Sequence, residues 1–232
     1  MNKQRVENLK SKSNYTVADL REIMEILRGE GGCPWDREQT HKSIRRNLIE
    51  ETYEVIEGID KNSDEVMCEE LGDLLLQVVF HARIAEEADA FNLDDVADGI
   101  CKKLILRHPH IFADVVADTS EEVLKNWDAI KQVEKHQKSD KEVLDAVSHS
   151  LPSLIRADKI GGKAAKQGRA IDTSALASLA AELSAAKSGD VGVHEKVGEL
   201  LLQAAVLAKT LGVDGEQALG DACDRFIAAV EE

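Results

Sequence analysis

Apolar residues recur at helical spacing through most of the chain, and this pattern predicts an all-α fold. In segment 16–28, for example, Leu20, Ile23, Met24 and Leu27 share one helical face. No convincing period-two alternation, the mark of a half-buried strand, appears anywhere in the sequence. The helices of the first half are expected at 16–28, 40–60, 64–88, 93–107 and 120–135.

The helices expected at 40–60 and 64–88 each carry an acidic cluster within apolar surroundings. Glu51 and Glu54 are three residues apart, as are Glu70 and Asp73, so each pair lies on one helical face. A connection of about ten residues, which includes 60–64, predicts a tight antiparallel hairpin. Folding this hairpin would bring the four carboxylates together.

Four half-buried carboxylates repel one another unless something neutralises them. Ligands that are all oxygen atoms suit a hard cation, Mg2+ or Mn2+. The simplest alternative is a solvated acidic face, which is what most Glu-rich helical stretches are. A di-iron site of the ferritin type would need Glu-x-x-His pairs. Neither cluster has one, since the residue three before His81 is Val78.

The chain is strongly acidic, with a formal net charge of -15. This charge disfavours binding to nucleic acid through a basic surface. An acidic protein that handles a polyanion needs metal ions and local cations. Such cations occur at Lys42 and Arg46, ahead of the first cluster, and at Lys103 and Arg107, which are four residues apart on one helical face.

The four cysteines form no C-x-x-C motif, so we expect free thiols in a reducing compartment. Residues 1–13 lack the apolar stretch of a signal peptide, and no apolar run approaches the length of a membrane span. We therefore predict a cytoplasmic protein without membrane contact.

Two local features leave alternatives open. Trp35 lies in a Gly/Pro loop at 31–36, where an indole is either a lid over a ligand or a plug at the end of the core. His108 and His110 flank Pro109, and they either bind a metal or, as we favour, cap and pack the end of a helix.

The chain is expected to divide into a disordered tail (1–14), a first domain (15–136) and a second domain (137–232). Aromatic residues are concentrated before residue 137. The two domains also contain an internal repeat, because 195–203 matches 69–77. At the metal-ligand positions the second copy has Lys196 and Glu199 where the first has Glu70 and Asp73. A lysine would repel a divalent cation, so the second repeat is predicted to have lost its site.

Several motifs resemble those of the MazG nucleoside triphosphate pyrophosphohydrolases, of the all-α NTP pyrophosphatase superfamily. The matching stretches are G-C-P-W-D-x-x-Q-T-H at 32–41, E-E-x-x-E at 50–54, 69–81, K-L-I-L-R-H-P-H-I-F at 103–112, and 127–135. Together they cover residues 16–136 nearly without a gap. The C-terminal part resembles the second domain of two-repeat members more weakly.

The resemblance implies hydrolysis of (d)NTPs to the monophosphate and pyrophosphate, with Mg2+, in a homodimer that has no nucleic-acid partner. It also implies the biological role expected of the family, which is housecleaning, the removal of non-canonical or damaged nucleotides from the nucleotide pool. It gives the metal ligands as Glu51, Glu54, Glu70 and Asp73, and the catalytic carboxylates as Glu50, Glu51 and Glu54. Substrate contacts are predicted from Trp35, Lys42, Arg46, Lys103, Arg107, Trp127 and Lys131.

Two other functions fit the same sequence. One is a non-catalytic nucleotide-binding or regulatory protein on this fold. The second repeat favours this reading, because it is predicted to keep the fold after losing its metal site. The other is a helical scaffold with a structural metal. Turnover separates the enzyme from both.

Overall fold

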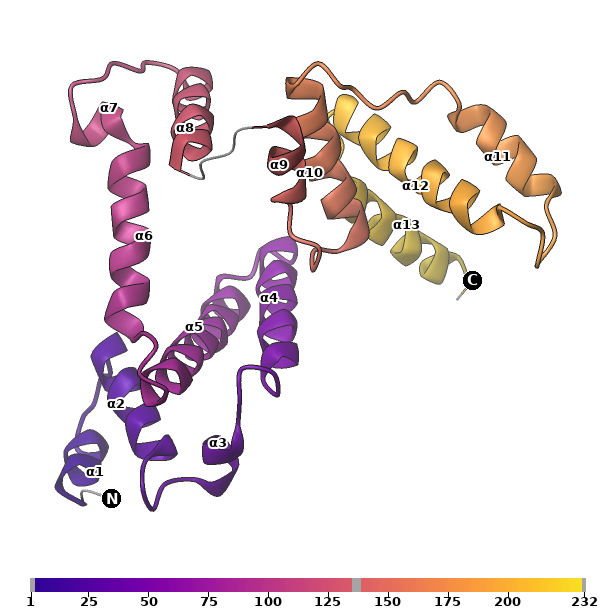
Figure 1. Cartoon of the computed structure of the whole chain (residues 1–232). Helices are drawn as coiled ribbons and strands as arrows, with labels where there is room; N and C mark the ends of the chain where they lie inside the picture. Colours follow the sequence, from indigo (N-terminus) through magenta and orange to yellow (C-terminus); the bar gives the residue numbers. More distant parts are fainter. Residues whose placement is uncertain (1–2, 135–138, 231–232) are drawn as a thin grey trace. The chain divides into compact units, whose positions relative to one another are not determined.

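The computed structural model describes residues 3–134 and 139–230, and all regular structure within these ranges is helical (Figure 1). The all-α prediction is therefore confirmed. The chain forms two compact units, residues 1–118 and 119–232. The first unit contains α1 (Lys3–Lys10), α2 (Val17–Arg28), α3 (Pro34–Glu38), α4 (Arg45–Asp60), α5 (Asp64–Glu87), α6 (Leu93–Arg107) and α7 (Pro109–Phe112). The second contains α8 (Ser120–Glu134), α9 (Asp140–Asp145), α10 (Ser153–Lys166), α11 (Leu176–Ala185), α12 (Val193–Thr210) and α13 (Gly215–Val230).

The expected disordered tail is wrong for residues 3–10, which form α1. Arg5 ties this helix to α2, since its guanidinium lies 2.7 Å from Glu22 and 2.7 Å from Glu25. Leu9 is buried. The two acidic partners are 17 and 20 residues away in sequence, so the local composition of the tail could not reveal the contact.

A capping box starts α2. The Thr16 hydroxyl accepts from the Asp19 backbone N–H, and the Thr16 backbone N–H donates to the Asp19 carboxylate. Lys12 forms an ion pair with the same carboxylate. These hydrogen bonds, the one from Lys12 first, lower the pKa of Asp19 to about 2, so the cap stays ionised.

The core of the first unit lies where α2, α5 and the start of α4 meet. Its buried side chains are Met24, Ile44, Val79 and Phe80. The predicted apolar face of α2 packs there, because Leu20 and Leu27 lie against these side chains, as do Leu76, Ile84 and Leu93. This core fixes one end of α5.

Helix α4 begins at Arg45 rather than at Thr40, so the predicted start of this helix is wrong. Residues 40–44 form a turn in which the backbone N–H of Thr40 donates to the Ser43 hydroxyl and that of Ser43 donates to the Thr40 hydroxyl. Hydroxyl side chains that bond nearby backbone groups compete with helix formation. The apolar periodicity of residues 40–60 contains no information on these hydroxyl–backbone bonds, so it predicted a helix that starts too early.

The α4–α5 hairpin is the most extensive helix pair of the described structure, and its tight end depends on Gly58. A Cβ atom at this buried position would lie 2.9 Å from the Met67 backbone nitrogen. Ser63 caps α5 by accepting from the Val66 N–H. The hairpin predicted from the two acidic clusters is therefore present, with its helices in close contact.

The second unit has a similar set of neighbours. Helices α10 and α11 both pack against α12, as α2 and α4 pack against α5 in the first unit. Gly161 lets α10 approach α12, since a Cβ there would lie 2.7 Å from a Val206 methyl group. This arrangement supports the predicted repeat, which stays a prediction. The expected domain boundary at 136/137 lies outside the described residues, and α8 belongs to the second compact unit.

Candidate functional site

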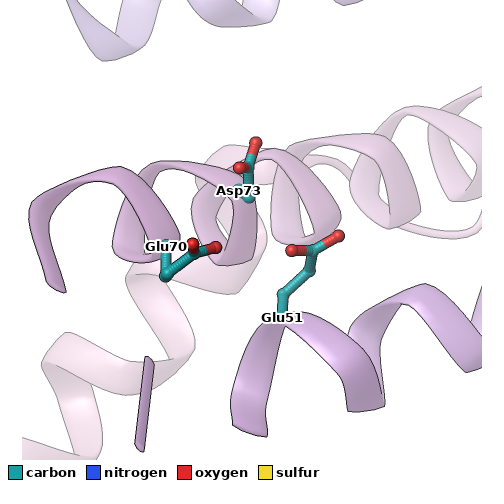
Figure 2. Close-up of side chains that lie close together, drawn as sticks. All are labelled: Glu51, Glu70 and Asp73. Carbon is teal, nitrogen blue, oxygen red and sulfur yellow. The ribbon is translucent and has the colours of Figure 1, made fainter. Parts of the chain in front are cut away.

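Three of the predicted metal ligands meet in the middle of the α4–α5 hairpin. Carboxylate oxygens of Glu51, Glu70 and Asp73 all lie within 4.8 Å of one another. Figure 2 shows Glu51 extending from α4 toward the part of α5 that carries Glu70 and Asp73. The fourth predicted ligand, Glu54, lies near Glu51 and, after burial and Asp73, contributes to the raised pKa of the Glu51 carboxyl. Oxygens this close together can contact a single cation.

Mutual repulsion and desolvation disfavour the ionised forms of these carboxylates. The pKa of Glu51 is raised, first by burial and then by the charge of Asp73 and by Glu54. The pKa of Glu70 is also raised, first by partial desolvation and then by Glu54, Glu69 and Asp73. No cation of the described chain is among these causes. A cluster with this electrostatic imbalance is suited to a bound cation.

Removing one charge from the cluster should stabilise the metal-free protein. Because the pKa of Glu70 is raised in the folded state, the folded protein binds its proton more tightly than the unfolded chain does. The stability contributed by this group is therefore lost as the pH rises through the raised pKa. We expect Glu70→Gln to raise the Tm at pH 7 in EDTA by about 2 °C. The gain should vanish below the ordinary Glu pKa of 4.5.

Glu30→Gln is the matched control, because it removes the same charge from an exposed position of the first unit. Differential scanning calorimetry in EDTA at pH 7 and at pH 4 would measure both effects. A lower Tm for Glu70→Gln at pH 7 would contradict the electrostatic account of the cluster.

Glu50, the predicted additional catalytic carboxylate, is paired with Arg46 instead of with the other three. The Arg46 guanidinium nitrogen Nε lies 2.8 Å from Glu50 Oε1, and both side chains are on the exposed side of α4. This pairing also occupies Arg46, one of the predicted substrate contacts. Glu54, whose charge acts on both Glu51 and Glu70, is therefore better placed than Glu50 to act at the cluster.

The tryptophan of the 31–36 loop is exposed. Trp35 lies on the short helix α3 with 58% of its surface accessible, which excludes the alternative that it plugs the core of this unit. The loop itself is anchored, since the nearly buried Arg28 side chain donates to the backbone oxygens of Asp36 and Gln39. Lys42 is exposed in the turn before α4. Both predicted contacts are therefore accessible to a ligand.

The structure does not bring Lys103 and Arg107 onto the carboxylates within this unit. Both lie on α6, which starts beside the core at the end of α5 and extends away from the hairpin (Figure 1). His108 ends this helix, and its ring nitrogen Nδ1 lies 2.6 Å from the Leu104 carbonyl oxygen. The favoured capping role of His108 is thus confirmed.

Trp127 and Lys131 lie on α8, in the second compact unit. Lys131 lines a cavity of that unit. The predicted substrate contacts therefore come from four separate elements: α3, α4 with its preceding turn, α6 and α8. Of these, α4 with its preceding turn supplies the contacts nearest the cluster in sequence.

The structure reveals a histidine pair that the sequence did not suggest. The Nδ1 atoms of His41 and His81 lie 2.8 Å apart, with the ring planes only 9° from parallel. Burial, and then the neighbouring His41, lower the pKa of His81. One ring donates its Nδ1 proton to the other, so the pair links the turn before α4 to α5. The two residues are 40 positions apart, and no local pattern connects them.

Comparison with known proteins places this hairpin in a described family. The model of the MazG nucleotide pyrophosphohydrolase domain matches residues 39–112, which include α4, α5 and α6. The nucleoside triphosphate pyrophosphohydrolase of Escherichia coli is 40% identical over 216 residues, covering 88% of this chain and 81% of the relative. The chain belongs to the MazG family. The family prediction is confirmed.

Two further relatives are covered by the similarity to different extents. The Thermotoga maritima nucleoside triphosphate pyrophosphohydrolase/pyrophosphatase MazG is 40% identical over 215 residues, covering 90% of this chain and 82% of the relative. Uncharacterized protein YabN of Bacillus subtilis is 46% identical over 146 residues, which is 63% of this chain but only 30% of YabN.

Two further predictions agree with the structure. All four cysteines are free thiols. Among the described residues, every helix is too short or too polar to cross a membrane.

Proposed function

We propose that this protein hydrolyses (d)NTPs to the monophosphate and pyrophosphate in a Mg2+-dependent reaction. The observation that carries the proposal is the convergence of Glu51, Glu70 and Asp73 between α4 and α5. This convergence lies within the part of the chain that matches the MazG domain. Relatives at 40% identity over most of the chain are named nucleoside triphosphate pyrophosphohydrolases.

The residues present fit a hard divalent cation. Glu51, Glu70 and Asp73, with Glu54 beside them, would hold it through oxygen atoms alone. The raised pKa values of Glu51 and Glu70 show that the like charges are not relieved by protein cations. When bound, Mg2+ supplies positive charge to the phosphates and makes a coordinated water more acidic.

The chain's own residues then bind the substrate and move one proton. Glu54 accepts a proton from the attacking water. The water oxygen bonds to the α-phosphorus while the bond from this phosphorus to the bridging oxygen breaks, and the electron pair leaves with pyrophosphate. Lys103 and Arg107, supplied by a second copy of the chain, stabilise the negative charge of the leaving pyrophosphate. The accessible indole of Trp35 contacts the nucleoside.

A second copy of the chain is proposed to complete the site. Apolar side chains on the hairpin remain accessible, among them Ile49 (47%), Tyr53 (48%) and Leu71 (47%). Leu104 on α6 is exposed to a similar extent, 47%. Burying these faces against another copy stabilises a homodimer and can bring a partner's α6 cations to the carboxylates. Sedimentation equilibrium showing only monomer at micromolar concentration would contradict this assembly.

The proposed biological role is removal of unwanted nucleotides from the cytoplasmic pool. The acidic surface of the chain agrees with a small substrate brought in with its metal rather than with nucleic acid.

Product analysis tests the proposed activity. The protein would be incubated with a panel of NTPs and dNTPs plus Mg2+, and the products separated by anion-exchange chromatography. We expect a monophosphate and pyrophosphate in equal amounts from at least one nucleotide. Diphosphate and orthophosphate would show cleavage of the wrong bond. The absence of any product would favour the non-catalytic binding protein.

A further inference from the structure

The second compact unit contains a cavity of about 520 Å3. Pockets of this size are typical of small-molecule binding sites. Its walls come from α8, α9, the segment after α9, α10 and α12. Apolar or small residues form one part of the lining: Val143, Ala146, Val147, Ser148, Leu151 and Gly162. The remaining lining residues are Lys131, Asp158, Lys159, Lys163, Lys166, Gln167 and Lys209.

The charge of this cavity is opposite to that of the chain. Its lining has five lysines and one aspartate, although the whole chain carries a net charge of -15. Asp158 is already occupied, because Lys209 Nζ lies 2.7 Å and 2.8 Å from its two carboxylate oxygens. Neither Lys159 nor Lys163 forms an ion pair with any residue in the described parts of the chain. A positive potential therefore remains in the cavity.

The spacing of the lysines on α10 places like charges together. Lys159 and Lys163 are four residues apart, and Lys166 follows three residues later, so all three lie on one side of the helix. Like charges at this spacing destabilise a helix. A bound anion would remove the repulsion, much as a cation would relieve the carboxylates of the α4–α5 hairpin.

The packing of α10 on α12 brings a lysine from a second helix to the same cavity. A Cβ atom at Gly162 would lie only 2.5 Å from Lys209 Cε, so the glycine leaves room for the lysine stem to lie across α10. The Asp158 ion pair then holds the ammonium group at the edge of the cavity. The cations therefore come from helices distant in sequence.

We propose that this cavity binds an oligophosphate anion without a metal ion. Ammonium groups bind phosphate as point charges, and a compact anion with several negative charges matches several lysines. The single carboxylate of the lining is paired, so the cavity has no ligand set for a divalent cation. The lysines lie in a small cavity rather than on an extended basic surface, so nucleic acid is not the expected ligand.

The lining also has room for the organic part of a nucleotide. Val147 is buried beneath the cavity and Leu151 is half-buried beside it. The side-chain oxygen of Gln167 is buried and lacks a hydrogen-bond partner among the described residues. This oxygen can accept a hydrogen bond from a ligand N–H or O–H. The shared chemistry is the phosphate chain, and either inorganic tripolyphosphate or a nucleoside triphosphate supplies it.

Isothermal titration calorimetry of the full chain in EDTA tests the proposal. The probes are inorganic tripolyphosphate and ATP. We expect one saturable site per chain for tripolyphosphate, with an affinity that falls as NaCl is raised. The double variant Lys159→Gln, Lys163→Gln should weaken binding at least about tenfold. An equal affinity of ATP and tripolyphosphate would assign binding to the phosphate chain, and tighter binding of ATP would add a contact with the nucleoside.

Two controls make the result specific to this cavity. Lys141→Gln, Lys187→Gln changes the net charge equally at exposed positions of the same unit that do not line the cavity, and it should bind like wild type. Lys103→Gln, Arg107→Gln alters α6 of the first unit and should also keep the site. Circular dichroism would verify helicity. No saturable heat with wild type, or an unchanged Kd in the cavity variant, would overturn the proposal. The proposal does not depend on hydrolysis by the first unit.

Discussion

Glu51→Gln and Asp73→Asn should each lower kcat by about 1,000-fold or more while the helical circular dichroism stays that of wild type. Each substitution replaces a carboxylate oxygen of the cluster by a neutral amide of nearly the same shape. Both side chains converge with Glu70 in the middle of the hairpin, so either change removes one proposed metal ligand and one negative charge. The core formed by Met24, Val79 and Phe80 is not touched by either change.

Glu30→Gln serves as the control for these variants, because it removes an exposed carboxylate of the same unit outside the cluster. Its kcat should stay within about twofold of wild type. Steady-state assays at saturating Mg2+ would measure all three variants. Normal turnover in both Glu51→Gln and Asp73→Asn would rule out the α4–α5 cluster as the reaction site.

Removal of divalent metal should abolish turnover altogether, and added Mg2+ should restore it. Without metal, several carboxylates face a substrate with about four negative charges, and the Coulomb repulsion opposes binding. Mn2+ should substitute for Mg2+, because the ligands are all oxygen atoms. The assay is hydrolysis after dialysis against EDTA, followed by titration with each metal.

A thermal readout separates metal binding from turnover. Mg2+ should raise the Tm of the wild-type protein, since a cation bound to the folded state relieves the repulsion that raises the pKa of Glu51 and Glu70. It should raise the Tm of Asp73→Asn much less. Full activity in EDTA, or an equal Mg2+-dependent Tm increase in both proteins, would contradict a metal site at this cluster.

The sequence predicted the parts of the fold that follow from local spacing. The limits of α6 and the start of α5 agree with the prediction to the residue, since Asn92 and Ser63 are clear N-caps. The acidic pairs on α4 and α5 were correctly expected to meet, because three-residue spacing fixes their face and a short connection fixes the hairpin.

Contacts between residues far apart in the sequence could not be predicted from local spacing. Arg5 reaches Glu22 and Glu25 on another helix, which is why residues 3–10 are ordered although their composition predicted a tail. The His41–His81 pair joins a turn to a helix 40 positions away. The start of α4 depends on side-chain bonds between Thr40 and Ser43, which periodicity does not register.

The largest differences between prediction and structure concern the residues expected to contact the substrate. Lys103 and Arg107 were expected beside the carboxylates because of the family resemblance, yet α6 extends away from the hairpin within its own unit. In the proposed homodimer these cations come from a second copy, and residues that reach a site in this way have no signature in one sequence. The sequence likewise did not predict that the lysines of the second-unit cavity come together, because they converge only when α10 packs on α12.

The position of 18O after hydrolysis in labelled water tests the central claim most directly. The protein, Mg2+ and a nucleoside triphosphate that it hydrolyses would react in H2 18O, and mass spectrometry would locate the label. Attack of water on the α-phosphorus beside the Glu51, Glu70 and Asp73 cluster places one 18O atom in the monophosphate and none in pyrophosphate. Label in pyrophosphate or orthophosphate would contradict the account, because water would then have attacked a different phosphorus atom.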